Sequence, residues 1–167
     1  MIKVIDGNIF NTDAKFIAHQ VNCQGKMGSG VAFQVKNRFP HVFTEYVRIA
    51  KQEMLGKIQI VPVNDKYLGY DSGSLAVPYT EQFIVNLFAQ DKYGYDNKIY
   101  TSLEALQECF ETLKWILFEK NNNFGSTIAM PYKIGCVRGG ADWNTVYQMI
   151  EETFKDCNVE LWRLDNG

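Results

Sequence analysis

An apolar segment that runs directly into a glycine-dense turn constrains the fold more than any other part of this sequence. Residues 16–21 are mostly apolar and predict a strand, and the run 19–32, HQVNCQGKMGSGVA, places three glycines just before a helical pattern. Glycine lets a backbone approach an anion without a Cβ atom in the way, and the first turn of a helix presents unpaired N–H groups. The segment therefore predicts an anion-binding strand–turn–helix unit, with a tight turn that binds nothing as the alternative.

A second glycine-rich segment has the same setting. Residues 130–143, MPYKIGCVRGGADW, stand between a predicted strand over 126–130 and a helical pattern over 143–154. In an open α/β sheet, loops at the carboxyl ends of parallel strands border one crevice in which ligands bind. Neither segment fits the patterns GxxxxGK[ST] or GxGxxG with an acid about 20 residues further on. We therefore expect one long ligand between the two loops, and neither a P-loop nor a dinucleotide-binding Rossmann fold.

The alternation of strand and helix patterns continues along the chain. Strands are predicted over Ile2–Ile5, Phe16–Val21, Ile58–Val63, Phe83–Phe88, Thr127–Met130 and Val159–Leu164. Pro40 fits the first turn of a helix, and Thr101 with Glu104 forms a predicted capping box before another. The pattern predicts the α/β class, with a mixed, mostly parallel central sheet between two layers of helices.

Composition and charge limit the function classes. The 167 residues suffice for one domain with a substantial core, which we expect to span residues 1–167. A net charge of −2 provides no basic field that would hold a nucleic acid duplex by its phosphates. The four cysteines form no CxxC pair, the first residues do not resemble a signal peptide, and no apolar run approaches the ~18 residues that span a bilayer. We therefore expect a cytoplasmic protein with reduced thiols and no membrane partner.

The segment 64–82 has no clear periodicity. A loop of that length is uncommon in a compact domain. We expect a surface hairpin there, with a lid or an oligomer contact as the alternatives.

The histidines and cysteines point away from metal and thiolate chemistry. The two histidines, His19 and His41, are not at metal-ligand spacing from cysteines or carboxylates. A cysteine phosphatase needs an arginine several residues after its thiolate, whereas Arg138 follows Cys136 after a single residue. We therefore expect a non-covalent mechanism without metal.

Three separated motifs together resemble the macrodomain family. They are the runs His19–Ala32, 84–94 (IVNLFAQDKYG) and Met130–Trp143, in the family's order, and the similarity extends over nearly the whole chain. It is greatest to the bacterial and phage branch that is related to ADP-ribose-1″-phosphate phosphatases. The resemblance implies a three-layer α/β/α macrodomain fold, an ADP-ribose derivative as the small-molecule partner, and no cofactor. Its leading implied activity is metal-independent removal of phosphate from ADP-ribose-1″-phosphate.

Two other functions stay open. One is a hydrolase that removes ADP-ribose from modified macromolecules or from O-acyl-ADP-ribose, and the other is a non-catalytic reader of ADP-ribose. Relatives of the first kind depend on a lysine after the middle strand. Here that region reads Ala89-Gln90-Asp91-Lys92, and Lys92 is out of register, which disfavours the lysine-dependent reaction.

The resemblance also implies the site residues. The substrate-binding set is Asn8, Ile9, Asn22, Gly28, Ser29, Gly30, Val31, Gly135, Cys136, Val137, Arg138 and Gly139. Asn22 is expected to bind hydroxyls of the distal ribose, and its alternative role is to satisfy backbone groups of the turn. Asn8 replaces the usual aspartate that accepts the adenine amino group, and its carbonyl oxygen can still accept that bond. Arg138 adds a cation beside the expected diphosphate, or is solvated at the rim.

His19 and Asp142 are the catalytic candidates. The resemblance implies an acid or base role for His19, but strand alternation places it on the face opposite Asn22, so only a bulge or bend would bring both to one pocket. A buried, hydrogen-bonded core histidine is the alternative. Asp142 fits a general base near a phosphate, and it equally fits an ordinary helix N-cap.

Overall fold

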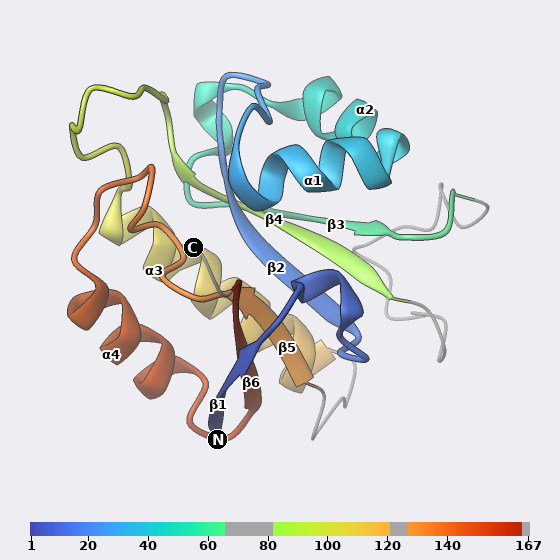
Figure 1. Ribbon diagram of the computed structural model, residues 1–167, viewed down its shortest axis with the longest axis vertical. Helices are drawn as coiled ribbons and strands as arrows, with labels where there is room; N and C mark the ends of the chain where they lie inside the picture. Colours follow the sequence, from blue (N-terminus) through green and yellow to red (C-terminus); the bar gives the residue numbers. More distant parts are fainter. Residues whose placement is uncertain (66–81, 121–126, 165–167) are drawn as a thin grey trace.

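A six-stranded sheet forms the centre of the computed structural model, which describes residues 1–65, 82–120 and 127–164 (Figure 1). The strands are β1 (Ile2–Asp6), β2 (Phe16–Asn22), β3 (Ile58–Pro62), β4 (Phe83–Gln90), β5 (Thr127–Pro131) and β6 (Asn158–Arg163). Their order is β1-β6-β5-β2-β4-β3, and all neighbours are parallel except the antiparallel pair β3 and β4. The predicted mixed, mostly parallel sheet is confirmed.

Helices cover both faces of the sheet. The helices are α1 (Gly30–Arg38), α2 (Pro40–Ile49), α3 (Leu103–Trp115) and α4 (Trp143–Thr153), with short 3-10 turns η1 (Ile9–Asn11) and η2 (Gln52–Met54) and a π-helical turn η4 (Ile116–Lys120). The buried residues of α1 and α2 pack with one face of β2 and β4, and those of α3 and α4 pack with the other (Figure 1). Each helix thus buries one apolar stripe against the sheet, which confirms the three-layer α/β/α architecture.

The predicted capping box at Thr101 is wrong by one residue. The N-cap of α3 is Ser102, whose hydroxyl accepts a hydrogen bond from Ala105 N at 3.1 Å. The Thr101 hydroxyl instead donates to the carbonyl oxygen of Gly135 at 2.7 Å. Because the Thr101 hydroxyl is bound to the loop that follows β5, the neighbouring Ser102 caps the helix instead.

The predicted loop over 64–82 falls largely on residues 66–81, which lie outside the described residues, so its hairpin, lid and oligomer-contact hypotheses stay predictions. Within the described part of the chain, no helix combines the length and apolar character needed to cross a membrane.

The two central strands β2 and β5 separate along their length. β2 pairs with β5 at Phe16 and Ile17, whereas its pairing with β4 continues to Asn22. The chain leaves β2 towards α1 on one face of the sheet and leaves β5 towards α4 on the other (Figure 1). Neighbouring parallel strands whose connections diverge in this way leave a crevice at their carboxyl ends, the place where open α/β sheets bind ligands.

Candidate ligand-binding site

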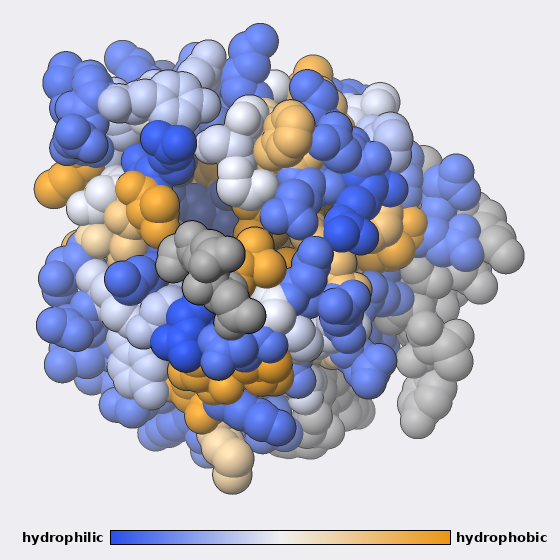
Figure 2. Space-filling model, viewed as in Figure 1, coloured by the Kyte–Doolittle hydropathy of each residue, from blue (hydrophilic) through white to orange (hydrophobic). Residues whose placement is uncertain are grey.

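A cavity of about 750 Å³ occupies this crevice. It is lined from the carboxyl ends of β1, β2, β4, β5 and β6 and from the loops that follow them. Figure 2 shows the hollow between α1 and the loop after β5. The volume lies within the range of small-molecule and cofactor sites. Another cavity, of about 640 Å³, lies between β3 and α3, away from both glycine loops.

Most of the residues predicted for the site line this cavity. Those that do are Asn8, Ile9, His19, Asn22, Gly28, Ser29, Gly30, Val31, Gly135, Val137, Arg138 and Gly139. Cys136 and Asp142 are not in the lining. The Cys136 Sγ donates to the Ile134 carbonyl oxygen at 3.4 Å, and burial raises the pKa of its thiol to about 11. A thiol with that pKa is protonated near neutral pH and is therefore a poor nucleophile.

The charged side chains in the lining all have the same sign. They are Lys26, Lys133, Arg138 and Arg163, and the described residues that line the cavity include no aspartate or glutamate. Arg163 forms an ion pair with Asp6 at 2.8 Å, while the others belong to the glycine-rich loops. In a chain with a net charge of −2, such a concentration of cations favours an anionic ligand.

The first glycine loop brings the start of α1 to the cavity. Ser29 is the N-cap residue, and Gly30, the first helical residue, has a φ of +60° that favours glycine. Residues 28–31 line the cavity, and the first turn of α1 contains no acidic residue. The unpaired N–H groups and the positive end of the helix dipole are therefore available to an anion.

Asn22 holds this loop together. Its Oδ1 accepts hydrogen bonds from Gln24 N at 3.0 Å and from the Tyr46 hydroxyl at 2.8 Å, and its Nδ2 donates to the Lys26 carbonyl oxygen at 2.9 Å. The role in the turn is therefore confirmed. One hydrogen of Nδ2 remains for a further acceptor, so the contact with a ribose hydroxyl stays a prediction.

The second glycine loop is fixed by a side chain from β2 and by Thr101, which lies just before the N-cap of α3. Gln20 Nε2 donates to the Thr101 hydroxyl at 2.7 Å, and that hydroxyl donates to the Gly135 carbonyl oxygen. A Cβ atom on Gly139 would collide with the Thr101 hydroxyl and lie 2.5 Å from the Gly135 carbonyl oxygen. The backbone at Gly139 can therefore come this close only without a side chain.

His19 and Asn22 both line the cavity, as do Gln20 and Val21 between them. The register with β4 shifts between Val21 and Asn22, which is the kind of bulge that the sequence required. His19 is buried, its Nε2 lies 2.6 Å from Asn86 Oδ1, and burial lowers the pKa of the imidazole to about 4. His19 is therefore buried and hydrogen-bonded, as the alternative of a core histidine predicts, and its acid or base role stays a prediction.

Asp142 is the N-cap of α4. Its Oδ2 accepts hydrogen bonds from Thr145 N at 3.0 Å and from Thr145 Oγ1 at 2.9 Å, and its side chain is exposed. The capping role is confirmed, and the catalytic role stays a prediction.

At the far end of the cavity, Asn8 is the N-cap of η1. Its Oδ1 accepts a hydrogen bond from Phe10 N at 2.9 Å. Asn8 lies there with Ile9, Trp162 and Leu164, so this end combines a polar group with apolar and aromatic walls. An adenine ring requires both, although the contact itself stays a prediction.

Sequence reasoning missed the aromatic rim of the cavity. Tyr93 and Tyr95, which follow β4, line the cavity and are 46% and 60% exposed, and the guanidinium carbon of Arg138 lies 4.5 Å from the ring centre of Tyr95. Their position after the carboxyl end of a parallel strand is a signal that could have identified them. Gln90, the last residue of β4, also lines the cavity, whereas Lys92 is exposed and is not in the lining.

Comparisons with known proteins agree on one fold and name more than one activity. The sequence matches no family model. It is 27% identical over 163 residues to a DNA ADP-ribosyl glycohydrolase of Thermus aquaticus, an alignment that covers 97% of this chain and 40% of that relative. It is 26% identical to an ADP-ribose 1″-phosphate phosphatase of Debaryomyces hansenii, with 99% and 100% of the two chains covered. This chain therefore spans about two fifths of the glycohydrolase.

The solved structures extend this similarity to three dimensions. The macrodomain of Mycobacterium tuberculosis DarG superposes with a TM-score of 0.75 at 24% identity, and the match covers 97% of each chain. At this identity, the likeness shows the fold of the chain and leaves its ligand and reaction to be argued from the cavity.

Proposed function

Because this chain has the macrodomain fold and its named relatives support membership of that family, we propose that the cavity binds ADP-ribose. The observation that carries this proposal is the lining, which combines two glycine-rich loops and four cationic side chains with no described acid. A diphosphate between two ribosides needs an anion site with a polar and aromatic compartment on each side. The cavity offers that sequence of environments along the edge of the sheet.

Each part of the ligand has a proposed location. The diphosphate lies between the start of α1 and the second glycine loop, with Arg138 as its additional cation. The adenosine lies at the end that contains Asn8 and Trp162, and the distal ribose lies towards Asn22 and His19.

We further propose that the protein is a hydrolase that removes the group carried on the 1″ position of the distal ribose, with ADP-ribose-1″-phosphate as the leading substrate. The phosphatase relative supports this choice because it matches this chain over the full length of both. Gln90 at the end of β4 supports it as well, since the resemblance requires a lysine in this region for the competing glycosidic reaction. His19, which lines the cavity, remains the proposed catalytic residue. Asp142 was the other candidate, but it is exposed, lies outside the lining and bonds to Thr145, so we assign it the N-cap role, which the variants described in the Discussion test.

Removal of ADP-ribose from a modified base is the second candidate. The DNA ADP-ribosyl glycohydrolase relative favours it. The exposed rings of Tyr93 and Tyr95 at the mouth of the cavity favour it too, because such rings can stack with an unpaired base. A non-catalytic reader would share the binding site and lack both reactions.

Calorimetric titration with ADP-ribose tests the binding proposal, with AMP as the ligand that lacks the diphosphate and distal ribose. Phosphate release from ADP-ribose-1″-phosphate and release of ADP-ribose from an ADP-ribosylated oligonucleotide then separate the two hydrolases. Binding without either release would identify a reader. No heat with millimolar ADP-ribose would contradict the proposed function as a whole.

A further inference from the structure

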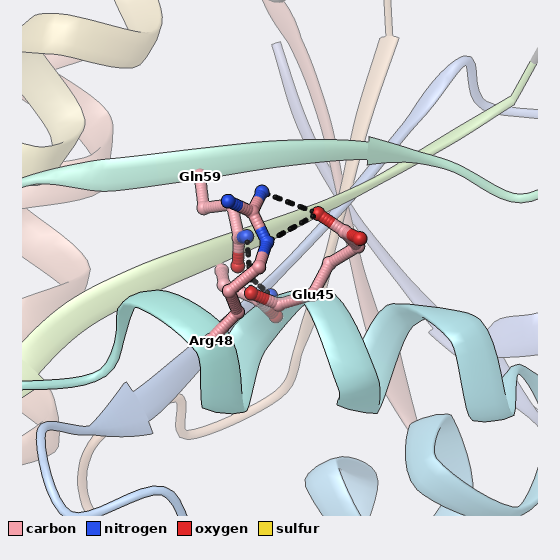
Figure 3. Close-up of polar contacts among 4 residues, drawn as sticks. Glu45, Arg48 and Gln59 are labelled. Carbon is pink, nitrogen blue, oxygen red and sulfur yellow. Dashed lines mark hydrogen bonds and ion pairs between the residues drawn. The ribbon is translucent and has the colours of Figure 1, made fainter. Parts of the chain in front are cut away.

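A row of hydrogen-bonded polar side chains crosses the sheet beneath α2 and ends at the cavity. His19 on β2 lies opposite Asn86 on β4, and Asn86 lies opposite Gln59 on β3. His19 Nε2 is 2.6 Å from Asn86 Oδ1, and Asn86 Nδ2 donates to Gln59 Oε1 at 3.0 Å. Gln59 Nε2 then donates to the backbone carbonyl oxygen of Glu45 in α2, also at 3.0 Å (Figure 3).

The backbone carbonyl at the end of the row fixes the direction of every bond in it. A carbonyl oxygen can only accept, so Gln59 must turn its NH2 group towards Glu45 and its oxygen towards Asn86. Asn86 must then turn its NH2 group towards Gln59 and its oxygen towards His19. An oxygen without hydrogen requires a donor opposite, so His19 must carry its proton on Nε2.

The other ring nitrogen of His19 is consequently a hydrogen-bond acceptor. Nδ1 is buried and has no hydrogen-bond partner within the described residues, and His19 lines the cavity. A buried acceptor without a donor destabilises a fold, so its presence beside a ligand cavity requires an explanation. Burial also disfavours the imidazolium, and the neutral ring keeps the lone pair on Nδ1.

We propose that Asn86 and Gln59 are positioning residues that hold His19 as the neutral Nε2–H tautomer, and that Nδ1 accepts a hydrogen bond from a hydroxyl group of the distal ribose of bound ADP-ribose. The second half rests on the proposed function, and the first half is independent of it. Nδ1 has almost no exposed area in the free protein. A ribose hydroxyl can therefore reach Nδ1 only if the cavity lining moves, and the contact exists only in the complex.

Nitrogen-15 NMR of the histidine rings tests the first half. The chain has two histidines, so a His41→Gln variant assigns both rings. We expect His19 to show a protonated Nε2 and an unprotonated Nδ1 at neutral pH. A protonated Nδ1, or a mixture of tautomers, in the free protein would overturn the role of Asn86 and Gln59.

Two substitutions of half-buried Gln59 form a matched pair. Glutamate at this position can only accept, so Gln59→Glu keeps Asn86 pointing its NH2 group towards β3. Lysine can only donate, so in Gln59→Lys the Asn86 amide either turns its oxygen towards β3 or loses its partner there. The Nε2–H tautomer of His19 is then no longer the main form. Loss of the tautomer in Gln59→Lys and its retention in Gln59→Glu are expected. The same tautomer in both folded variants would contradict the relay.

Ligand titration tests the second half. We expect ADP-ribose to move the Nδ1 resonance upfield, as an acceptor nitrogen moves when it gains a donor, and ADP, which lacks the distal ribose, to leave it in place. The Kd for ADP-ribose should rise about 3- to 10-fold in Gln59→Lys and stay near the wild-type value in Gln59→Glu. ADP-ribose that binds by calorimetry without moving Nδ1 would overturn this inference and leave the proposed function intact. An absence of binding heat would reject the proposed function itself.

Discussion

Asp142 has two possible roles, and two substitutions at this position separate them. Its carboxylate accepts hydrogen bonds from Thr145 N at 3.0 Å and Thr145 Oγ1 at 2.9 Å. Loss of an N-cap costs about 1 kcal/mol, which corresponds to about 2–4 °C in melting temperature for a chain of this size. Asparagine caps a helix as well as aspartate but cannot act as a base. We therefore expect Asp142→Ala to melt about 2–4 °C lower and Asp142→Asn to melt like the wild type.

Turnover of the two variants completes this test. Because Asp142 is exposed and is not in the cavity lining, the geometry favours the cap, and we expect both variants to hydrolyse the wild-type substrate at nearly the wild-type rate. A general base contributes a factor of about 100 or more. Thermal melts and initial rates under saturating substrate measure the two effects separately. A 100-fold loss of rate in both variants, with normal melting of Asp142→Asn, would refute this reasoning and establish the catalytic role.

Four further predictions concern the cavity and its surroundings. ADP-ribose at ~100 times its Kd should add about 2.7 kcal/mol to the free energy of unfolding, measured by thermal melting, and an equal concentration of AMP should add clearly less. Gly30→Glu should abolish binding of ADP-ribose by calorimetry, because a carboxylate enters the anion site, while Gly30→Asn, which tolerates a φ of +60°, should keep measurable affinity. Gly139→Ala should destabilise the fold by about 1–3 kcal/mol in denaturant titrations through its collision with Thr101, whereas Gly28→Ala, whose Cβ would lie 3.7 Å from the Tyr95 hydroxyl, should cost less. Folding lowers the pKa of His19 from 6.5 to about 4, so its contribution to the free energy of unfolding is present above pH 6.5 and is lost as the pH falls towards 4. Denaturant titrations at several pH values should therefore show a shallower decline in the free energy of unfolding for His19→Gln than for the wild type.

The sequence alone was sufficient to predict the three-layer architecture and the edge of the sheet at which the cavity lies. Alternating strand and helix patterns determine a mostly parallel sheet, and the carboxyl ends of parallel strands meet at one edge, so both glycine loops had to meet there. The same rule, applied to the strand that ends at Gln90, would also have placed Tyr93 and Tyr95 at this edge.

Contacts between distant residues account for what the sequence could not provide. Thr101 is a reasonable cap by its spacing, yet its hydroxyl is taken by Gly135, which is 34 positions away. Strand alternation separates His19 from Asn22, yet both line the cavity at the end of β2, where the register with β4 shifts. The polarity of the row that ends at His19 depends on a carbonyl in α2, and no local pattern encodes such a contact.

The pairing of β1 with β6 makes the end of the cavity that contains Asn8 and Trp162 the last of its walls to be synthesised. Ile2 lies in register with Val159, and Asn8 shares its end of the cavity with Trp162 and Leu164. Closing a loop of such length is entropically costly, and folds dominated by these contacts form slowly. A nascent chain that already carries both glycine loops therefore still lacks one wall of the cavity, which is complete only after residues 158–164 have been synthesised and have paired with the first strand.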